Sequence, residues 1–131
     1  ALLGGSVKGK TIALWGLAFK AQTDDMRESS ALTFVAGAVA EGAQVRGHDP
    51  KALDEARRRL GDRITYCERQ YDALEGADAL VILTEWQEYR VLDYERARKL
   101  MKQPLIVDAR NLYDPARVRH AGFTYDSIGR P

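Results

Sequence analysis

The sequence has only one cysteine, Cys67, and this scarcity limits the chemistry that the chain can perform. A single thiol cannot form an internal disulfide or supply a metal site built on several thiolates, so we expect a reducing compartment, with the cytoplasm as the default. Cys67 itself is interpreted as a small apolar residue. His48 and His120 have no partner at metal-ligand spacing, and no metal site is expected.

An excess of charge of one sign is also missing. The 20 Lys and Arg residues nearly cancel the 19 Asp and Glu residues, whereas a nucleic-acid-binding face needs a clear basic excess. The one dense basic run, Arg57 to Arg59, follows Asp54 and Glu55 without interleaved aromatic residues. This pattern predicts the solvated face of a helix, and no nucleic-acid partner is expected.

Long hydrophobic runs are absent as well. No apolar stretch approaches the ~20 residues that span a bilayer, and residues 1–10 lack the apolar core of a signal peptide. We therefore expect a soluble chain with no membrane partner. Apolar residues make up 45% and charged residues 30% of the 131 positions, which is typical of one folded domain with one core.

The sequence does contain a repeated alternation of short apolar runs and helix-period segments. The strands are expected at residues 11–16, 44–50, 63–67, 79–83, 105–108 and 123–129. The helices are expected at residues 29–43, 52–60 and 93–103, with a short helical link at 68–74. This order predicts an α/β fold: a doubly wound, Rossmann-like, mostly parallel sheet of about six strands with helices on both faces. The most apolar run, 79–83, is expected near the centre.

The segment after the first strand, residues 16–28, is unusually rich in charge. Ligands of a doubly wound sheet bind beyond the carboxyl ends of the strands, where this loop lies. It lacks a G-x-G-x-x-G pattern, so a self-contained NAD site is not expected. Lys20 and Arg27 suit phosphate oxygens as a point charge and a bidentate donor. Alternatively, Asp24 and Asp25 pair with them in structural salt bridges, and the residues alone leave both interpretations open.

Three other strand ends carry candidate residues. Arg110 follows an apolar strand and either contacts a ligand or holds a neighbouring loop. Asp49 lies where many dinucleotide folds keep a ribose-binding acid, but its spacing and the following Pro50 favour a helix-capping or turn role. Glu85 and Trp86 follow the most apolar strand, where they either meet a base or sugar or, for Trp86, belong to the core.

Five segments in order carry a resemblance: "GLAFKAQTDDMRES", "GHDP", "LTEW", "VDARN" and "SIGR". Together they resemble the C-terminal, UDP-binding domain of the UDP-glucose/GDP-mannose dehydrogenase family, and most closely its UDP-glucose 6-dehydrogenases. The resemblance extends from about Lys10 to Arg130. It assigns residues 10–131 to a UDP-sugar-binding domain, and residues 1–9 to a linker that is the tail of an interdomain helix.

The resemblance implies an enzyme that oxidises C6 of a UDP-sugar to a carboxylate with two NAD⁺ through a covalent thiol adduct. In this family the NAD fold and the nucleophilic cysteine lie upstream, and Cys67 does not match the nucleophile's motif. We therefore expect an excised or truncated domain without catalytic residues, inactive by itself. Its implied partners are UDP-glucose or a related nucleotide sugar and the N-terminal NAD domain. The full enzyme is expected to be a homo-oligomer, whereas for the fragment a monomer is one of the states left open.

Site residues also follow from the resemblance. Phe19 and Lys20 match the family's contacts to the UDP-sugar, and Arg110 matches an arginine that reaches the substrate. Arg27 matches an arginine that faces the NAD side of the interdomain cleft. Under this interpretation, Asp24 and Asp25 support the two cations of their loop.

The sequence departs from the family pattern at Ala21, where a proline is common, and at Ala109, where glycine is usual. The first change loosens the loop, and the second matters only if that position needs a positive φ. Two other functions remain open from the residues: a stand-alone regulatory module that senses a uridine nucleotide, and an oligomerisation domain with a vestigial site. An upstream G-x-G-x-x-G segment would favour the enzyme.

Overall fold

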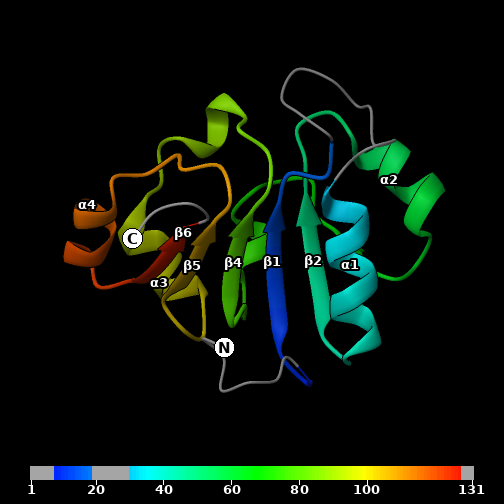
Figure 1. Cartoon of the computed structure of the whole chain (residues 1–131), viewed down its shortest axis with the longest axis horizontal. Helices are drawn as coiled ribbons and strands as arrows, with labels where there is room; N and C mark the ends of the chain where they lie inside the picture. The colour runs from blue at the N-terminus through cyan, green and yellow to red at the C-terminus, as the bar shows by residue number, and fades with distance from the viewer. Residues whose placement is uncertain (1–7, 19–29, 128–131) are drawn as a thin grey trace.

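A computed structural model of the chain describes residues 8–18 and 30–127, and these contain one six-stranded sheet. Its strands are β1 (Thr11–Trp15), β2 (Gln44–His48), β3 (Thr65–Tyr66), β4 (Ala79–Ile82), β5 (Leu105–Asp108) and β6 (Thr124–Ser127). The spatial order is β3-β2-β1-β4-β5-β6, and every neighbouring pair is parallel. The order reverses between β1 and β4, as in a doubly wound fold. The carboxyl ends of β1, β2 and β4 lie along the upper edge in Figure 1.

Helices cover the two faces of the sheet. They are α1 (Ser30–Ala40), α2 (Leu53–Leu60), α3 (Tyr94–Leu100) and α4 (Pro115–His120), with single 3₁₀ turns η1 (Asp72–Leu74) and η2 (Gln87–Tyr89). One apolar cluster contains residues of α1 and α2, and a second contains residues of α3 and α4. None of the described helices has the length and apolar character that crossing a membrane requires.

Strand β1 shows why the core has two halves. Ile12 and Leu14 belong to the α1–α2 cluster, whereas Ala13 and Trp15 belong to the other, and all four are buried. Successive side chains of a strand point to opposite faces, so an almost continuous apolar run is what a strand covered on both faces requires. Trp15 fills its side by stacking on the ring of Tyr89, with 4.9 Å between the ring centroids.

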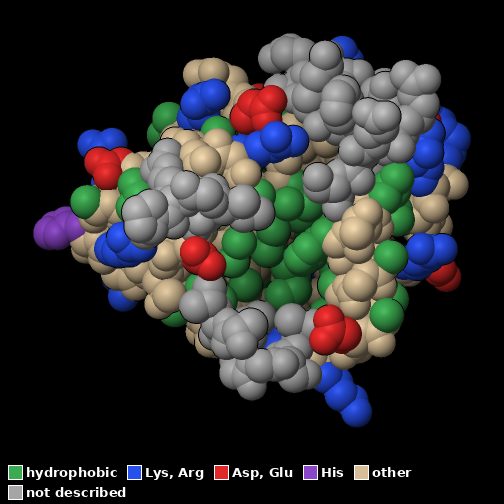
Figure 2. Space-filling view, viewed as in Figure 1, with side chains coloured by type: hydrophobic (Ala, Val, Ile, Leu, Met, Phe, Trp, Pro, Cys, Tyr) green, Lys and Arg blue, Asp and Glu red, His purple; other side chains and the backbone are tan. Residues whose placement is uncertain are grey.

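The face that carries α1 is not covered evenly. Within the described residues, the helical members of its cluster come from α1 and α2, which lie toward the β1–β2 side. Leu83 directly follows β4, and Val107 lies in β5. Both belong to the same cluster and remain partly exposed. Figure 2 shows hydrophobic side chains open in the middle of this face, beside α1.

The predicted architecture is confirmed, with differences of a few residues at the ends of most elements, as at α1, which ends at Ala40, and β2, which ends at His48. The sheet is wholly parallel, β4 lies centrally beside β1, and β5 has the expected bounds. β3 is shorter than expected because Arg63 still belongs to the turn after α2, where its N–H donates to Leu60 O (3.3 Å). α3 ends at Leu100 because Met101 is extended.

α4 is absent from the sequence-based prediction. Its N-cap, Asp114, accepts a hydrogen bond from Ala116 N at 3.1 Å, and Pro115 occupies the first turn. An Asp followed by Pro is a recognised helix start, so the signal was present in the sequence. The expected linker at residues 1–9 lies almost wholly outside the described residues.

Candidate functional site

Four strand ends meet at the carboxyl edge of the sheet. β1 lies between β2 and β4, and β5 follows β4, so the segments after these strands are neighbours. The point where strand order reverses, between β1 and β4, is where open α/β sheets bind ligands. The candidate site is therefore built from residues that directly follow β1, β2, β4 and β5.

Asp49, which follows β2, ties three of these segments together with one oxygen. Its Oδ2 accepts hydrogen bonds from the backbone N–H of Leu17 (2.8 Å) and of Ala18 (3.0 Å), and from the indole Nε1–H of Trp86 (3.2 Å). Leu17 and Ala18 follow β1, and Trp86 follows β4. The buried carboxylate therefore fixes the backbone at the edge of the sheet, where β1 meets its neighbours.

The other oxygen of Asp49 serves the start of α2. Oδ1 accepts from Lys51 N and Ala52 N, both at 2.9 Å. This confirms the turn role, one of the two alternatives predicted for Asp49; the N-cap of α2 is Ala52, which makes no side-chain capping bond. With only 2% of the residue exposed and five donors on its two oxygens, Asp49 does not present a carboxylate to a ribose. Trp86 is likewise buried, as its core interpretation predicts.

Gly16 and Thr84 bring the ends of β1 and β4 into direct contact. Gly16 has a φ of +103°, and a Cβ built there would lie 2.5 Å from Thr84 Oγ1 and 2.7 Å from its backbone N. The buried Thr84 hydroxyl donates to Ala18 O at 2.9 Å. Only glycine fits this approach, and the contact fixes the chain at Ala18, immediately before Phe19.

Arg110 lies at the same edge and is held to the segment after β4. Its Nε donates to Leu83 O at 2.8 Å and lies 3.3 Å from Glu85 Oε2. Both charged side chains are half-exposed, each at 38%. Of the two interpretations of Arg110, the loop-holding contact is therefore present, and ligand contact stays a prediction.

Asp108, the last residue of β5, orders the turn that carries Arg110. Its Oδ1 accepts from Arg110 N (3.0 Å), and its Oδ2 accepts from Leu112 N (2.7 Å) and the hydroxyl of Tyr125 (2.8 Å). Among the described non-glycine residues, only Asn111 has a positive φ, 56°. The alanine at position 109 is therefore not strained, which answers the question raised by its departure from the family pattern.

His48 and Tyr89 form a buried pair that the sequence did not reveal. His48 Nδ1 lies 2.8 Å from the Tyr89 hydroxyl, which also donates to His48 O at 3.1 Å. Burial lowers the pKa of His48, and the charges of Asp49, Glu88 and Asp72 oppose that shift in part. We therefore expect a neutral imidazole in the folded chain. The two residues are 41 positions apart, and no local pattern links them.

A shallow groove of about 470 Å³ lies beyond the ends of β2 and β3. It is lined by His48, Pro50, Glu68, Arg69, Gln70, Tyr71, Glu88 and Arg96. Its acidic and basic side chains balance, and the Arg96 guanidinium lies over the Tyr71 ring at 4.4 Å from the centroid. The lining therefore has no net charge that would select one class of ionic ligand.

The structure describes one of the predicted ligand residues. Phe19, Lys20 and Arg27 lie outside the described residues, as do Asp24 and Asp25, and Arg110 is the predicted site residue that the structure places. Within residues 8–18 and 30–127, no group of three or more His, Cys, Asp or Glu side chains is arranged to hold a metal ion. Cys67 is buried, and burial raises the pKa of its thiol, as expected for an apolar role.

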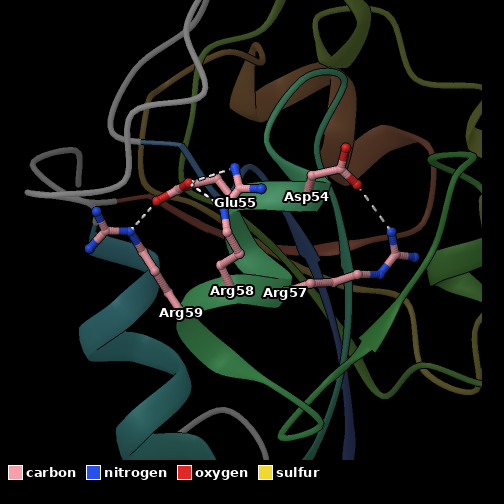
Figure 3. Close-up of polar contacts among 5 residues, drawn as sticks. All are labelled: Asp54, Glu55, Arg57, Arg58 and Arg59. Carbon is pink, nitrogen blue, oxygen red and sulfur yellow. Dashed lines mark hydrogen bonds and ion pairs between the residues drawn. The ribbon is translucent and has the colours of Figure 1, made fainter.

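The basic run on α2 also behaves as expected. Arg58 Nη2 lies 2.9 Å and Arg59 Nε 2.7 Å from the Glu55 carboxylate, as Figure 3 shows. Arg57 pairs with Asp54 at 3.5 Å. These pairs lie within one helix at its solvent-facing side, where ion pairs contribute little to stability. The run is a solvated helix face whose arginines pair with acids of the same helix.

Comparisons with known proteins identify the domain type. Residues 13–115 match the model of the UDP-glucose/GDP-mannose dehydrogenase family, UDP binding domain. The chain is 46% identical to a UDP-glucose 6-dehydrogenase of Pseudomonas aeruginosa and 47% identical to one of Rhizobium meliloti, over 99% and 100% of its length. It spans about 30% of each of these relatives. A solved UDP-glucose dehydrogenase from Pyrobaculum islandicum superposes with a TM-score of 0.81 at 33% identity, covering 97% of this chain and 27% of that one.

Proposed function

Because the chain belongs to the UDP-glucose/GDP-mannose dehydrogenase family as its UDP binding domain, we propose that it holds the nucleotide-sugar substrate of an NAD-dependent UDP-glucose 6-dehydrogenase. The reaction takes the C6 alcohol of UDP-glucose through an aldehyde to the carboxylate of UDP-glucuronate. Each of its two oxidations passes a hydride to one NAD⁺, and a water supplies the second oxygen. In this proposal, residues 10–131 form the substrate-binding domain and perform none of these bond changes.

NAD is not proposed to bind within this chain alone. The segment that follows β1 begins "GLA" and has no second glycine for close approach of a pyrophosphate. The acid after β2, Asp49, has both oxygens occupied by protein donors. These residues do not fit a dinucleotide. The cofactor is therefore assigned to an N-terminal domain of the enzyme, with Arg27 facing it across the cleft.

The substrate contacts are assigned to Phe19, Lys20 and Arg110. The single observation that supports this most is the position of Arg110, held by Leu83 O at the edge of the sheet. Thr84, the residue after Leu83, bonds to Ala18 O, and the chain passes from Ala18 directly to Phe19 and Lys20. An ammonium and a guanidinium on adjacent segments suit a diphosphate, which carries charge on several oxygens.

Isothermal titration calorimetry tests the proposal. UDP or UDP-glucose is expected to bind the chain weakly, NAD⁺ alone to give no heat, and Lys20→Ala to remove the UDP signal. Lys99→Ala is a matched control, because Lys99 is exposed and pairs with Glu95 on α3, so this variant should bind UDP as the unmodified chain does. A dissociation constant of about 1 mM corresponds to a binding free energy of about −4 kcal/mol. Absence of both heat and a thermal shift at about 1 mM UDP would contradict the proposal.

A further inference from the structure

Glu85 and Arg110 form an ion pair at the ligand-binding edge of the sheet. Glu85 follows β4 and Arg110 follows β5. The Arg110 Nε donates to Leu83 O at 2.8 Å and lies 3.3 Å from Glu85 Oε2. Two acceptors from one segment therefore meet the same nitrogen of the guanidinium.

The pair adds little to the stability of the fold. Both side chains are 38% exposed, and exposed pairs of this kind contribute about 0–1 kcal/mol. The backbone turn that carries Arg110 is already fixed by Asp108, which accepts hydrogen bonds from Arg110 N, Leu112 N and Tyr113 N. Stability of the fold therefore does not explain why Glu85 lies beside Arg110. The effect of the Glu85 charge on Arg110 offers an explanation.

We propose that Glu85 is a counter-ion of Arg110 that positions the guanidinium before a ligand arrives and limits how tightly the site holds a diphosphate. This inference rests on the proposed function, since it takes Arg110 as a phosphate contact. An anion that reaches Arg110 approaches the Glu85 carboxylate as well, and the repulsion between them offsets part of the attraction to the guanidinium. The Leu83 carbonyl is uncharged, so it keeps Arg110 in place without this repulsion. Glu85 is a positioning residue in this scheme.

The Glu85→Gln variant isolates the charge. Glutamine keeps the size of the side chain and an oxygen that accepts from Arg110 Nε, but it removes the negative charge. We expect the dissociation constants of UDP and of inorganic pyrophosphate to fall about three- to tenfold at low ionic strength. This gain should shrink as salt is added, because exposed charges are screened. A purely structural role for Glu85 would not produce a gain that depends on salt.

Two variants complete the measurement. Glu88→Gln changes the net charge equally, but it does so at a side chain that lines the groove beyond β2 and β3, so we expect a change in the dissociation constants of less than about twofold. In an Arg110→Ala background, Glu85→Gln should bring no gain, because its effect acts through Arg110. Thermal unfolding midpoints of all variants identify any that fail to fold.

The outcomes separate the two proposals. UDP binding that Glu85→Gln leaves unchanged or weakens would overturn the role of Glu85 and leave the proposed function standing. Tighter pyrophosphate binding by Glu85→Gln, with UDP bound no better than pyrophosphate, would support the role of Glu85 and contradict a uridine nucleotide as the ligand. No binding of either anion by the unmodified chain and by Glu85→Gln would overturn both.

Discussion

Replacing Asp49 with asparagine should destabilise the chain more than its small chemical change suggests. The carboxylate accepts four backbone N–H groups and one indole N–H. Asparagine has the same shape, but one of its two terminal atoms is an NH₂ group, which donates and cannot accept. Whichever way the amide is oriented, its nitrogen faces at least two N–H donors that lose their acceptor.

The expected cost follows from that count. A donor left without a partner in a buried place costs about 1–3 kcal/mol, so two of them cost about 2–6 kcal/mol. Domains of this size have a free energy of unfolding of about 5–15 kcal/mol. Asp49→Asn should therefore remove a large part of the stability. With the NH₂ group in place of Oδ1, the two donors that lose their acceptor are Lys51 N and Ala52 N, and the turn before α2 loosens. With the NH₂ group in place of Oδ2, Leu17, Ala18 and Trp86 lose their shared acceptor, and the segments after β1 and β4 loosen together.

Urea unfolding followed by circular dichroism measures this loss. With a denaturant dependence of about 1–3 kcal/mol per molar urea, the midpoint should fall by about 0.7 M or more. Asp54→Asn is the matched control, because the side chain of Asp54 is 85% exposed and has one ion pair, with Arg57; its effect should stay within about 0.5 kcal/mol. A loss below about 1 kcal/mol for Asp49→Asn would refute the reasoning.

Two further outcomes can be checked by stability measurements. Gly16→Ala should lower the thermal midpoint clearly more than Gly61→Ala, because both residues have a positive φ but only a Cβ at Gly16 would meet Thr84, at 2.5 Å; equal shifts would show that the contact relaxes freely. The free energy of unfolding should fall as the pH drops from 7 to about 5, because burial lowers the pKa of His48 below its ordinary 6.5 and the unfolded chain then binds the proton more readily. Urea titrations across this pH range should show that the free energy of unfolding of His48→Gln depends less on pH than that of the unmodified chain. An unchanged pH dependence would contradict the lowered pKa of His48.

The strands β1, β4 and β5 were predictable because they are almost wholly buried apolar runs. β5 was placed at its correct bounds because the run "LIVD" follows a proline and ends on an acid. α4 was missed because it is only six residues long and has one buried side chain, Val118. A periodic apolar stripe cannot develop over so few residues, and the Asp114–Pro115 start was the remaining signal.

The candidate site was predictable in location and less so in its contacts. The sequence indicated that Asp49 orders the turn before a helix, since those bonds reach only to Lys51 and Ala52. Its bonds to Leu17 and Trp86 span 32 and 37 positions, so they depend on the strand order and have no local signature. The family resemblance is confirmed by the comparisons, whereas the ligand roles of Phe19, Lys20, Arg27 and Arg110 stay predictions.

The strand order also constrains how the chain is synthesised. Of the six described strands, β1 is synthesised first, yet it pairs on one side with β2 and on the other with β4. Thr11 N donates to Asp78 Oδ2, 67 positions later, and at about 5–20 residues per second that distance takes about 3–13 s to translate. During this interval the edge of β1 that later pairs with β4 is open, and Trp15 lacks the Tyr89 ring on which it later stacks. The first half of the polypeptide is thus exposed to mispairing with neighbouring nascent chains until the second half emerges.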